Sequence, residues 1–239
     1  MIDYPFDEWF ESSPLGERHP AVQRAMDYAD GIGLEEHRFF EIAASSPVAL
    51  RAWVTQELIV TGPFSQALLR LAALVPNVHM RAMVMVVIGG EHGRVVGGRA
   101  PGSHPWLLNE LRKSMGIEKK EVQPLSETVE FIGVLDREVG SVIGGLAAAG
   151  IGNERLILGE YSAVKLCFEA CWPNSKYARF LDANITEDFQ HSDLLADVAS
   201  ILIEQGASPV EYYNAAMRSV DARVKFYDRL ANRILADQI

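Results

Sequence analysis

Residues 184–195, NITEDFQHSDLL, combine several groups that can bind a metal with the periodicity of a helix. Positions i, i+4 and i+7 share one face of a helix, and here they are Asn184, Asp188 and His191. Two interpretations are open. The acidic groups could form an ordinary solvated face, or this face could be one wall of a metal site inside a helical bundle.

Other ionisable groups fall in apolar segments. Glu91 follows the run MVMVVIGG, His104 opens HPWLL, and Glu160 lies within LILGEYSAVKLCFEA. A buried charge is costly unless it is paired or bound to metal. Helical bundles build iron–carboxylate sites from such inward groups, and Glu, Asp and His ligands suit iron or manganese. Each residue also has a purely structural interpretation: His104 could cap its helix, and Glu160 could pair with Lys165 or Arg155.

Composition limits the classes of function. The chain has 239 residues, 49% of them hydrophobic, and a net charge of −10, which argues against a nucleic-acid binder or attraction to anionic lipid. The acidic N-terminus does not resemble a signal peptide, and no apolar run reaches the length of a membrane span. The two cysteines, Cys167 and Cys171, are too few for a disulfide framework and suit buried thiols. We therefore expect a cytoplasmic protein.

The hydrophobic periodicity is helical nearly everywhere, and no segment alternates as a strand would. We predict one all-α domain over residues 1–239, a single compact helical bundle preceded by an N-terminal arm at 1–19. There is no Walker loop and no G-x-S-x-G elbow. The segments expected to be helical are 20–30, 34–45, 46–60, 64–75, 77–90, 104–116, 126–150, 153–171, 175–205 and 208–237.

The order of the motifs resembles the haem-oxygenase-like superfamily, in particular its iron-containing redox enzymes, which are related to pyrroloquinoline-quinone synthase and thiaminase II. The resemblance covers about residues 35–205. Its most distinctive part is a glutamate-glycine turn followed by a His-Pro-x-Leu-Leu helix that ends in glycine. The segments that carry it are HRFFEIA (37–43), LRAWVTQELIVTGPF (50–64), GGEHG (89–93), SHPWLLNELRKSMGI (103–117) and NITEDFQHSDLL (184–195).

This resemblance implies a haem-oxygenase-like bundle that binds one or two iron ions. The metal ligands that it implies are Glu91, His104, Glu160, Asp188 and His191.

The sequence departs from the family pattern at two positions. Asn184 stands where the family has a histidine, and Gly90 stands where it has a second acid. An amide oxygen binds iron less well than imidazole does, so one iron position is weakened. His104, His191 and one carboxylate could still form a mononuclear two-His-one-carboxylate site, and Glu187 could replace Asp188 as a ligand.

The resemblance implies a non-haem iron oxidase or oxygenase that acts on a small organic acid or amine with O2. A metal-free enzyme on the same scaffold is the alternative. It would be a quinone-synthase-like oxidase with His92 as acid or base, or a thiaminase-II-like hydrolase with Cys167 or Cys171 as nucleophile. A non-catalytic relative that binds a small molecule is the third hypothesis. The superfamily also suggests a homodimer, but nothing in the sequence locates its interface.

Overall fold

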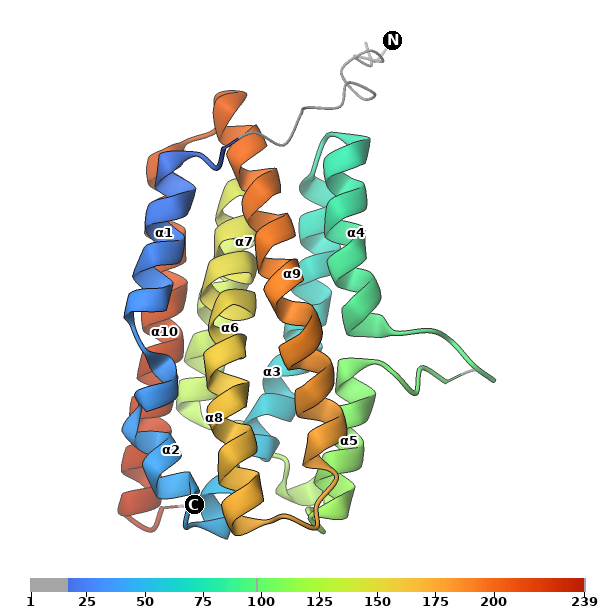
Figure 1. Ribbon diagram of the computed structural model, residues 1–239, viewed down its shortest axis with the longest axis vertical. Helices are drawn as coiled ribbons and strands as arrows, with labels where there is room; N and C mark the ends of the chain where they lie inside the picture. The colour runs from blue at the N-terminus through green and yellow to red at the C-terminus, as the bar shows by residue number, and fades with distance from the viewer. Residues whose placement is uncertain (1–16, 98, 239) are drawn as a thin grey trace.

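The computed structural model describes residues 17–97 and 99–238, apart from the side chains of residues 187–189. The helices lie side by side along one long axis, with α1 and α10 at one side of the bundle and α4 and α5 at the other (Figure 1). The α-helices are α1 (Pro20–Gly31), α2 (Arg38–Ala43), α3 (Pro47–Leu74), α4 (Val78–His92), α5 (His104–Ser114), α6 (Ser126–Glu138), α7 (Val142–Ala149), α8 (Leu156–Cys171), α9 (Tyr177–Glu204) and α10 (Pro209–Leu235). The short elements are the 3₁₀ helices η1 (Leu34–Glu36) and η2 (Lys119–Glu121) and the π-helix η3 (Gly150–Arg155).

The predicted all-α bundle is confirmed. The described residues contain no strand, only an isolated bridge between Val96 and Arg99. None of their helices is long and apolar enough to cross a membrane. Most of the predicted N-terminal arm, residues 1–16, lies outside the described residues, and α1 begins at Pro20.

Several predicted helix boundaries were wrong. The helix expected over 34–45 is divided into η1 and α2 at the extended His37, and the break expected after residue 150 is absent because η3 joins α7 to α8. The break expected at Gly62–Phe64 is absent, because α3 runs through Pro63. A proline removes one hydrogen bond from a helix interior, but the buried face of α3 continues on both sides of it, with Val60 and Phe64 in the core. The single helix expected over 126–150 is divided into α6 and α7, since Ser141 caps a new helix by accepting a hydrogen bond from the amide of Gly144 at 3.1 Å.

The π-helix η3 joins α7 to α8 and packs tightly between α9 and α10. A Cβ added at Gly152 would lie 2.2 Å from Cβ of Ser219 on α10, and one at Gly150 would lie 2.9 Å from Cβ of Leu195 on α9. The two glycines therefore allow this close approach. Single π-turns inside α-helices occur frequently at functional sites, and η3 provides a residue of the site described next.

Candidate metal centre

Three buried side chains from separate elements converge inside the bundle. Glu91 of α4, Glu154 of η3 and His191 of α9 each offer one possible ligand atom, and these atoms lie within 4.8 Å of one another. Their residues are only 4%, 0% and 4% exposed. Nδ1 of His191 lies 3.6 Å from Oε2 of Glu154. We call Glu91, Glu154 and His191 the carboxylate–imidazole cluster.

His104 adjoins this cluster from the first residue of α5. Its Nδ1 lies 2.7 Å from Oε1 of Glu91, and the residue is 2% exposed. The backbone explains how the end of α4 meets the start of α5. Gly93 ends α4 with a positive φ of 62°, and a Cβ there would lie 2.7 Å from the backbone nitrogen of Ser103. Glycine tolerates both the positive φ and the close approach of Ser103, because it has no Cβ. This turn brings Glu91 and His104 together.

A small cavity lies against Glu91 and His104, with a volume of about 10 Å³, enough for about one water molecule. Asn153 and Asn184 also line it. The side-chain nitrogen of Asn184 donates to the backbone oxygen of Phe180 at 2.7 Å, within its own helix. Oδ1 of Asn153 is buried and has no hydrogen-bond partner among the described residues.

These donors fit a divalent cation. Two carboxylates and an imidazole, with a second imidazole beside them, are the hard and borderline ligands that iron and manganese accept. The buried acceptor oxygen of Asn153 adds a further polar group that a cation or its bound water would satisfy. Because the cluster is buried, a bound cation would also offset the cost of its clustered negative charge.

The structure therefore brings together three of the residues singled out in the sequence, Glu91, His104 and His191. The side chain of Asp188, like that of Glu187, lies outside the described residues.

Glu160 does not join the cluster. It accepts hydrogen bonds from Nε of Arg223 at 2.8 Å, from Nη2 of the same residue, and from the hydroxyl of Tyr227 at 2.5 Å. Its expected partners lie elsewhere: Lys165 pairs with Asp182, and Arg155 pairs with Asp30. Glu160 thus forms an ion pair, as one interpretation of the sequence predicted, but its partner is Arg223 of α10 and not Lys165 or Arg155.

Sequence reasoning missed Glu154. The residue precedes Arg155 in GIGNER, and a glutamate beside an arginine is typical of a solvated helix face. The π-turn η3 changes the register of the helix at this point, so Glu154 lies inside with no exposed surface. The signal that could have revealed it is the pair of glycines at 150 and 152, which marks a segment packed closely on its neighbours.

Burial disfavours the thiolate form of both cysteines. The thiol of Cys167 donates to the backbone oxygen of Phe40 at 3.3 Å, and burial raises its pKa to about 11. Burial also raises the pKa of Cys171. A raised pKa disfavours the thiolate, which is the nucleophilic form of cysteine. His92, the other alternative, shares a 2.8 Å hydrogen bond between its Nε2 and Oγ of Ser65.

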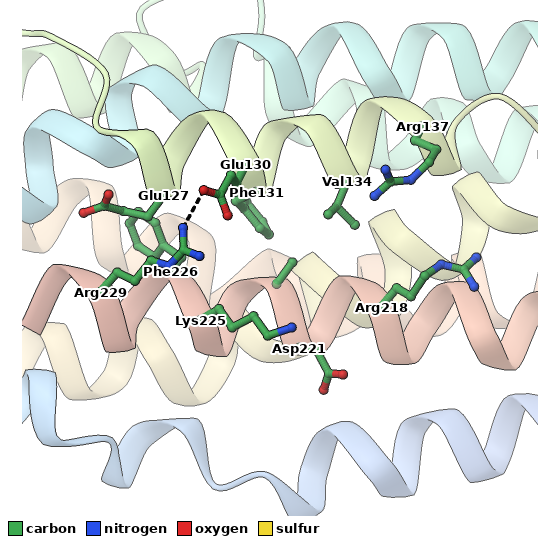
Figure 2. A pocket seen from close by; sticks show the side chains of 11 residues that line it. Glu127, Glu130, Phe131, Val134, Arg137, Arg218, Asp221, Lys225, Phe226 and Arg229 are labelled. Carbon is green, nitrogen blue, oxygen red and sulfur yellow. Dashed lines mark hydrogen bonds and ion pairs between the residues drawn. The ribbon is translucent and has the colours of Figure 1, made fainter.

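A larger hollow, about 270 Å³, lies on the outside of the bundle between α6 and α10 (Figure 2). Phe131 and Phe226 line it, together with charged side chains that largely pair with one another or with neighbours. Arg229 and Glu130 face each other across it, with Nη1 of Arg229 2.5 Å from Oε1 of Glu130. Arg218 forms an ion pair with Glu138. None of the residues singled out from the sequence lines this groove.

No protein-family model and no curated protein matches the sequence. Solved structures do match over nearly the whole chain. A TenA homologue from Pseudomonas syringae pv. tomato has a TM-score of 0.73 at 16% identity, covering 93% of this chain and 99% of its own. A CADD-like protein of unknown function from Nostoc punctiforme has a TM-score of 0.65 at 17% identity, covering 89% and 97%.

The chain has the haem-oxygenase-like fold. A TenA family transcription regulator from a Silicibacter species is a further match, with a TM-score of 0.63 at 13% identity that covers 92% of this chain and 99% of its own. The predicted haem-oxygenase-like bundle is thereby confirmed as a fold. Within that fold, the carboxylate–imidazole cluster is the feature of this chain from which a function can be argued.

Proposed function

We propose that this protein is a non-haem iron oxidase or oxygenase that acts on a small organic acid or amine with O2. The observation that supports this is the convergence of Glu91, Glu154 and His191, fully enclosed, with His104 beside them. Such a set holds iron through oxygen and nitrogen ligands. One or two ions are compatible with the proposal, and Asp188, on the same turn of α9 as His191, is a further candidate ligand.

Iron bound here would supply the redox chemistry with O2. The chain's own residues hold and orient it. The contact between His104 and Glu91 fixes the direction of that carboxylate, as outer partners of metal ligands commonly do. The apolar core around the cluster keeps bulk water away.

The cavity is too small for an organic substrate without movement of its walls. Thr61 and Phe64 of α3 line it on either side of Pro63, where the helix lacks one backbone hydrogen bond. We propose that this stretch of α3 yields when substrate enters.

Iron analysis of anaerobically loaded protein tests the proposal. We expect about one or two Fe(II) ions per chain, lost in Glu154→Gln and in His191→Ala. Glu160→Gln is the matched comparison, because it removes the same charge from a buried glutamate outside the cluster. Circular dichroism establishes that each variant is folded.

The proposal fails if the folded wild-type protein binds no iron, or if Glu160→Gln loses iron while Glu154→Gln keeps it. Absence of iron would favour a metal-free enzyme or a non-catalytic binding protein. The hydrogen bond from the side chain of Asn184 to its own helix supports both of these metal-free alternatives. For a metal-free enzyme, the hydrogen-bonded His92 would be the residue to test as acid or base. The homodimer and the cytoplasmic location remain predictions.

A further inference from the structure

A second buried cluster lies beside the cavity and contains two acids but one base. Glu57 of α3, Glu160 of α8 and Arg223 of α10 have side chains that are 4%, 0% and 1% exposed. Nη2 of Arg223 donates to Oε2 of Glu57 at 2.9 Å, and the same guanidinium donates twice to Glu160. Glu57 also lines the cavity against Glu91 and His104.

The charges of this cluster do not balance when both acids are ionised. Within residues 17–97 and 99–238, Arg223 is the only lysine or arginine that forms an ion pair with either carboxylate. The other titratable groups facing them are Tyr161 and Tyr227, which are neutral donors, and, across the cavity from Glu57, the pair of Glu91 and His104, which adds no free positive charge to balance the second acid. An uncompensated negative charge in an apolar interior is costly, and two carboxylates at one site raise the pKa of one of them. Burial, followed by the charge of Glu160, raises the pKa of Glu57 against the opposing effect of Arg223.

The hydrogen bonds indicate which acid holds the proton. Glu160 accepts two bonds from Arg223 and one from Tyr227, all of which favour a carboxylate. Glu57 accepts one bond from Arg223 and one from the hydroxyl of Tyr161 at 3.0 Å. Each carboxyl oxygen has two lone pairs, so Glu57 can carry a proton while accepting both bonds.

We infer that Glu57 is a neutral carboxylic acid that donates a proton to a ligand in the cavity. This inference rests on the proposed function, in which O2 is reduced and protons are consumed. In the transfer, the O–H bond of Glu57 breaks and a bond forms to an oxygen or nitrogen atom of the ligand that has gained negative charge. Glu57 becomes a carboxylate, which Arg223 and Tyr161 already stabilise, and a hydronium proton from the solvent restores the acid when the cavity opens to release the product.

Infrared spectroscopy of the metal-free protein in D2O tests the protonation. A protonated carboxyl group absorbs at a different infrared frequency from a carboxylate. The difference spectrum of wild type minus Glu57→Gln should therefore show the band of the protonated Glu57 at neutral pH. Two matched variants locate the proton: Tyr161→Phe, which removes a bond to Glu57, should shift the band, whereas Tyr227→Phe, which removes a bond to Glu160, should leave it in place. No band, or a band that responds only to Tyr227→Phe, would overturn the inference. If Glu57→Gln does not fold, the loss of the protonated carboxyl band as the pH of the wild-type protein is raised reports the same protonation.

The donor role is tested by adding azide to the Fe(II)-loaded protein under nitrogen. We expect the Glu57 band to move to lower frequency, because the acid then donates a hydrogen bond to the anion. An unchanged band with azide bound to the iron would show that Glu57 does not reach the ligand. Failure to bind iron would remove the proposed function and with it the donor role, while the band in the metal-free protein would still report the protonation of Glu57.

Discussion

Replacing Arg223 by leucine should destabilise this protein strongly at alkaline pH and only weakly at acid pH. The guanidinium is the only basic group paired with Glu57 and Glu160 among the described residues, and it is 1% exposed. Removing one partner of a buried ion pair typically costs about 3–5 kcal/mol, since the remaining charge has neither water nor a counter-ion.

The magnitude can be worked out from protonation. Without Arg223, both acids must be neutral in the folded protein. Glu57 is already neutral by our inference, so one additional carboxyl takes up a proton. Its pKa in the unfolded chain is about 4.3, so holding it protonated costs at most about 5 kcal/mol at pH 8 and about 1 kcal/mol at pH 5. A carboxyl whose folded-state pKa is raised is favourable below its unfolded pKa and loses this advantage as pH rises. The penalty therefore grows with pH.

Urea unfolding followed by circular dichroism at pH 5 and pH 8 measures this difference. In a chain of this length the penalty at pH 8 corresponds to a fall in melting temperature of roughly 10–20 °C. Arg229→Leu is the matched control on the same helix: its side chain is 46% exposed and pairs with an exposed Glu130, so we expect a loss of about 1 kcal/mol or less. A penalty for Arg223→Leu that is below about 1 kcal/mol at pH 8, or equal at both pH values, would refute the reasoning.

Three further outcomes can be measured. Gly152→Ala should lower the free energy of unfolding in urea by about 1–3 kcal/mol, because the added methyl group meets Ser219. Combining it with Ser219→Gly should recover part of the loss, and no recovery would mean that this contact is not the cause. Cys171 should react with iodoacetamide faster than Cys167, whose thiol is buried with a pKa of about 11, as mass spectrometry of the native protein would show. His104→Ala should lower Fe(II) affinity about 10–100-fold in a chelator competition, and unchanged affinity would exclude it from the metal centre.

Local patterns in the sequence were sufficient to predict most of the fold. Hydrophobic periodicity placed the helices. The helix expected from residue 46 begins at Pro47, with Ser46 as its cap, because serine at the cap and proline in the first turn are local start signals. One error fell where tertiary packing overrides local preference: Pro63 is tolerated inside α3 because the apolar face continues past it. Another was a local signal that was overlooked: α7 begins anew at Ser141 because that residue caps it.

The candidate site was only partly accessible from the sequence. Glu91 and His104 stood out because each is an ionisable group in an apolar segment, and His191 stood out because it shares a helix face with Asn184 and Asp188; the structure brings Glu91, His104 and His191 together. Glu154 was missed because a π-turn is not visible in a pattern with a period of 3.6 residues. The pairing of Glu160 with α10 joins residues 63 positions apart, and no local signal specifies such a contact.

The central tryptophan gives the interior a spectroscopic reporter. Trp53 is fully buried, its indole nitrogen donates to the hydroxyl of Tyr227 at 2.8 Å, and its ring meets that of Tyr161 edge-on at 5.5 Å. Tyr161 lines the cavity, so this fluorophore lies one side chain away from any occupant. Loading a paramagnetic ion would quench its emission, whereas a diamagnetic ion such as Zn²⁺ would leave it bright. Because the chain has three other tryptophans, the emission of the wild type minus that of Trp53→Phe would follow the state of the enclosed centre without labelling the protein.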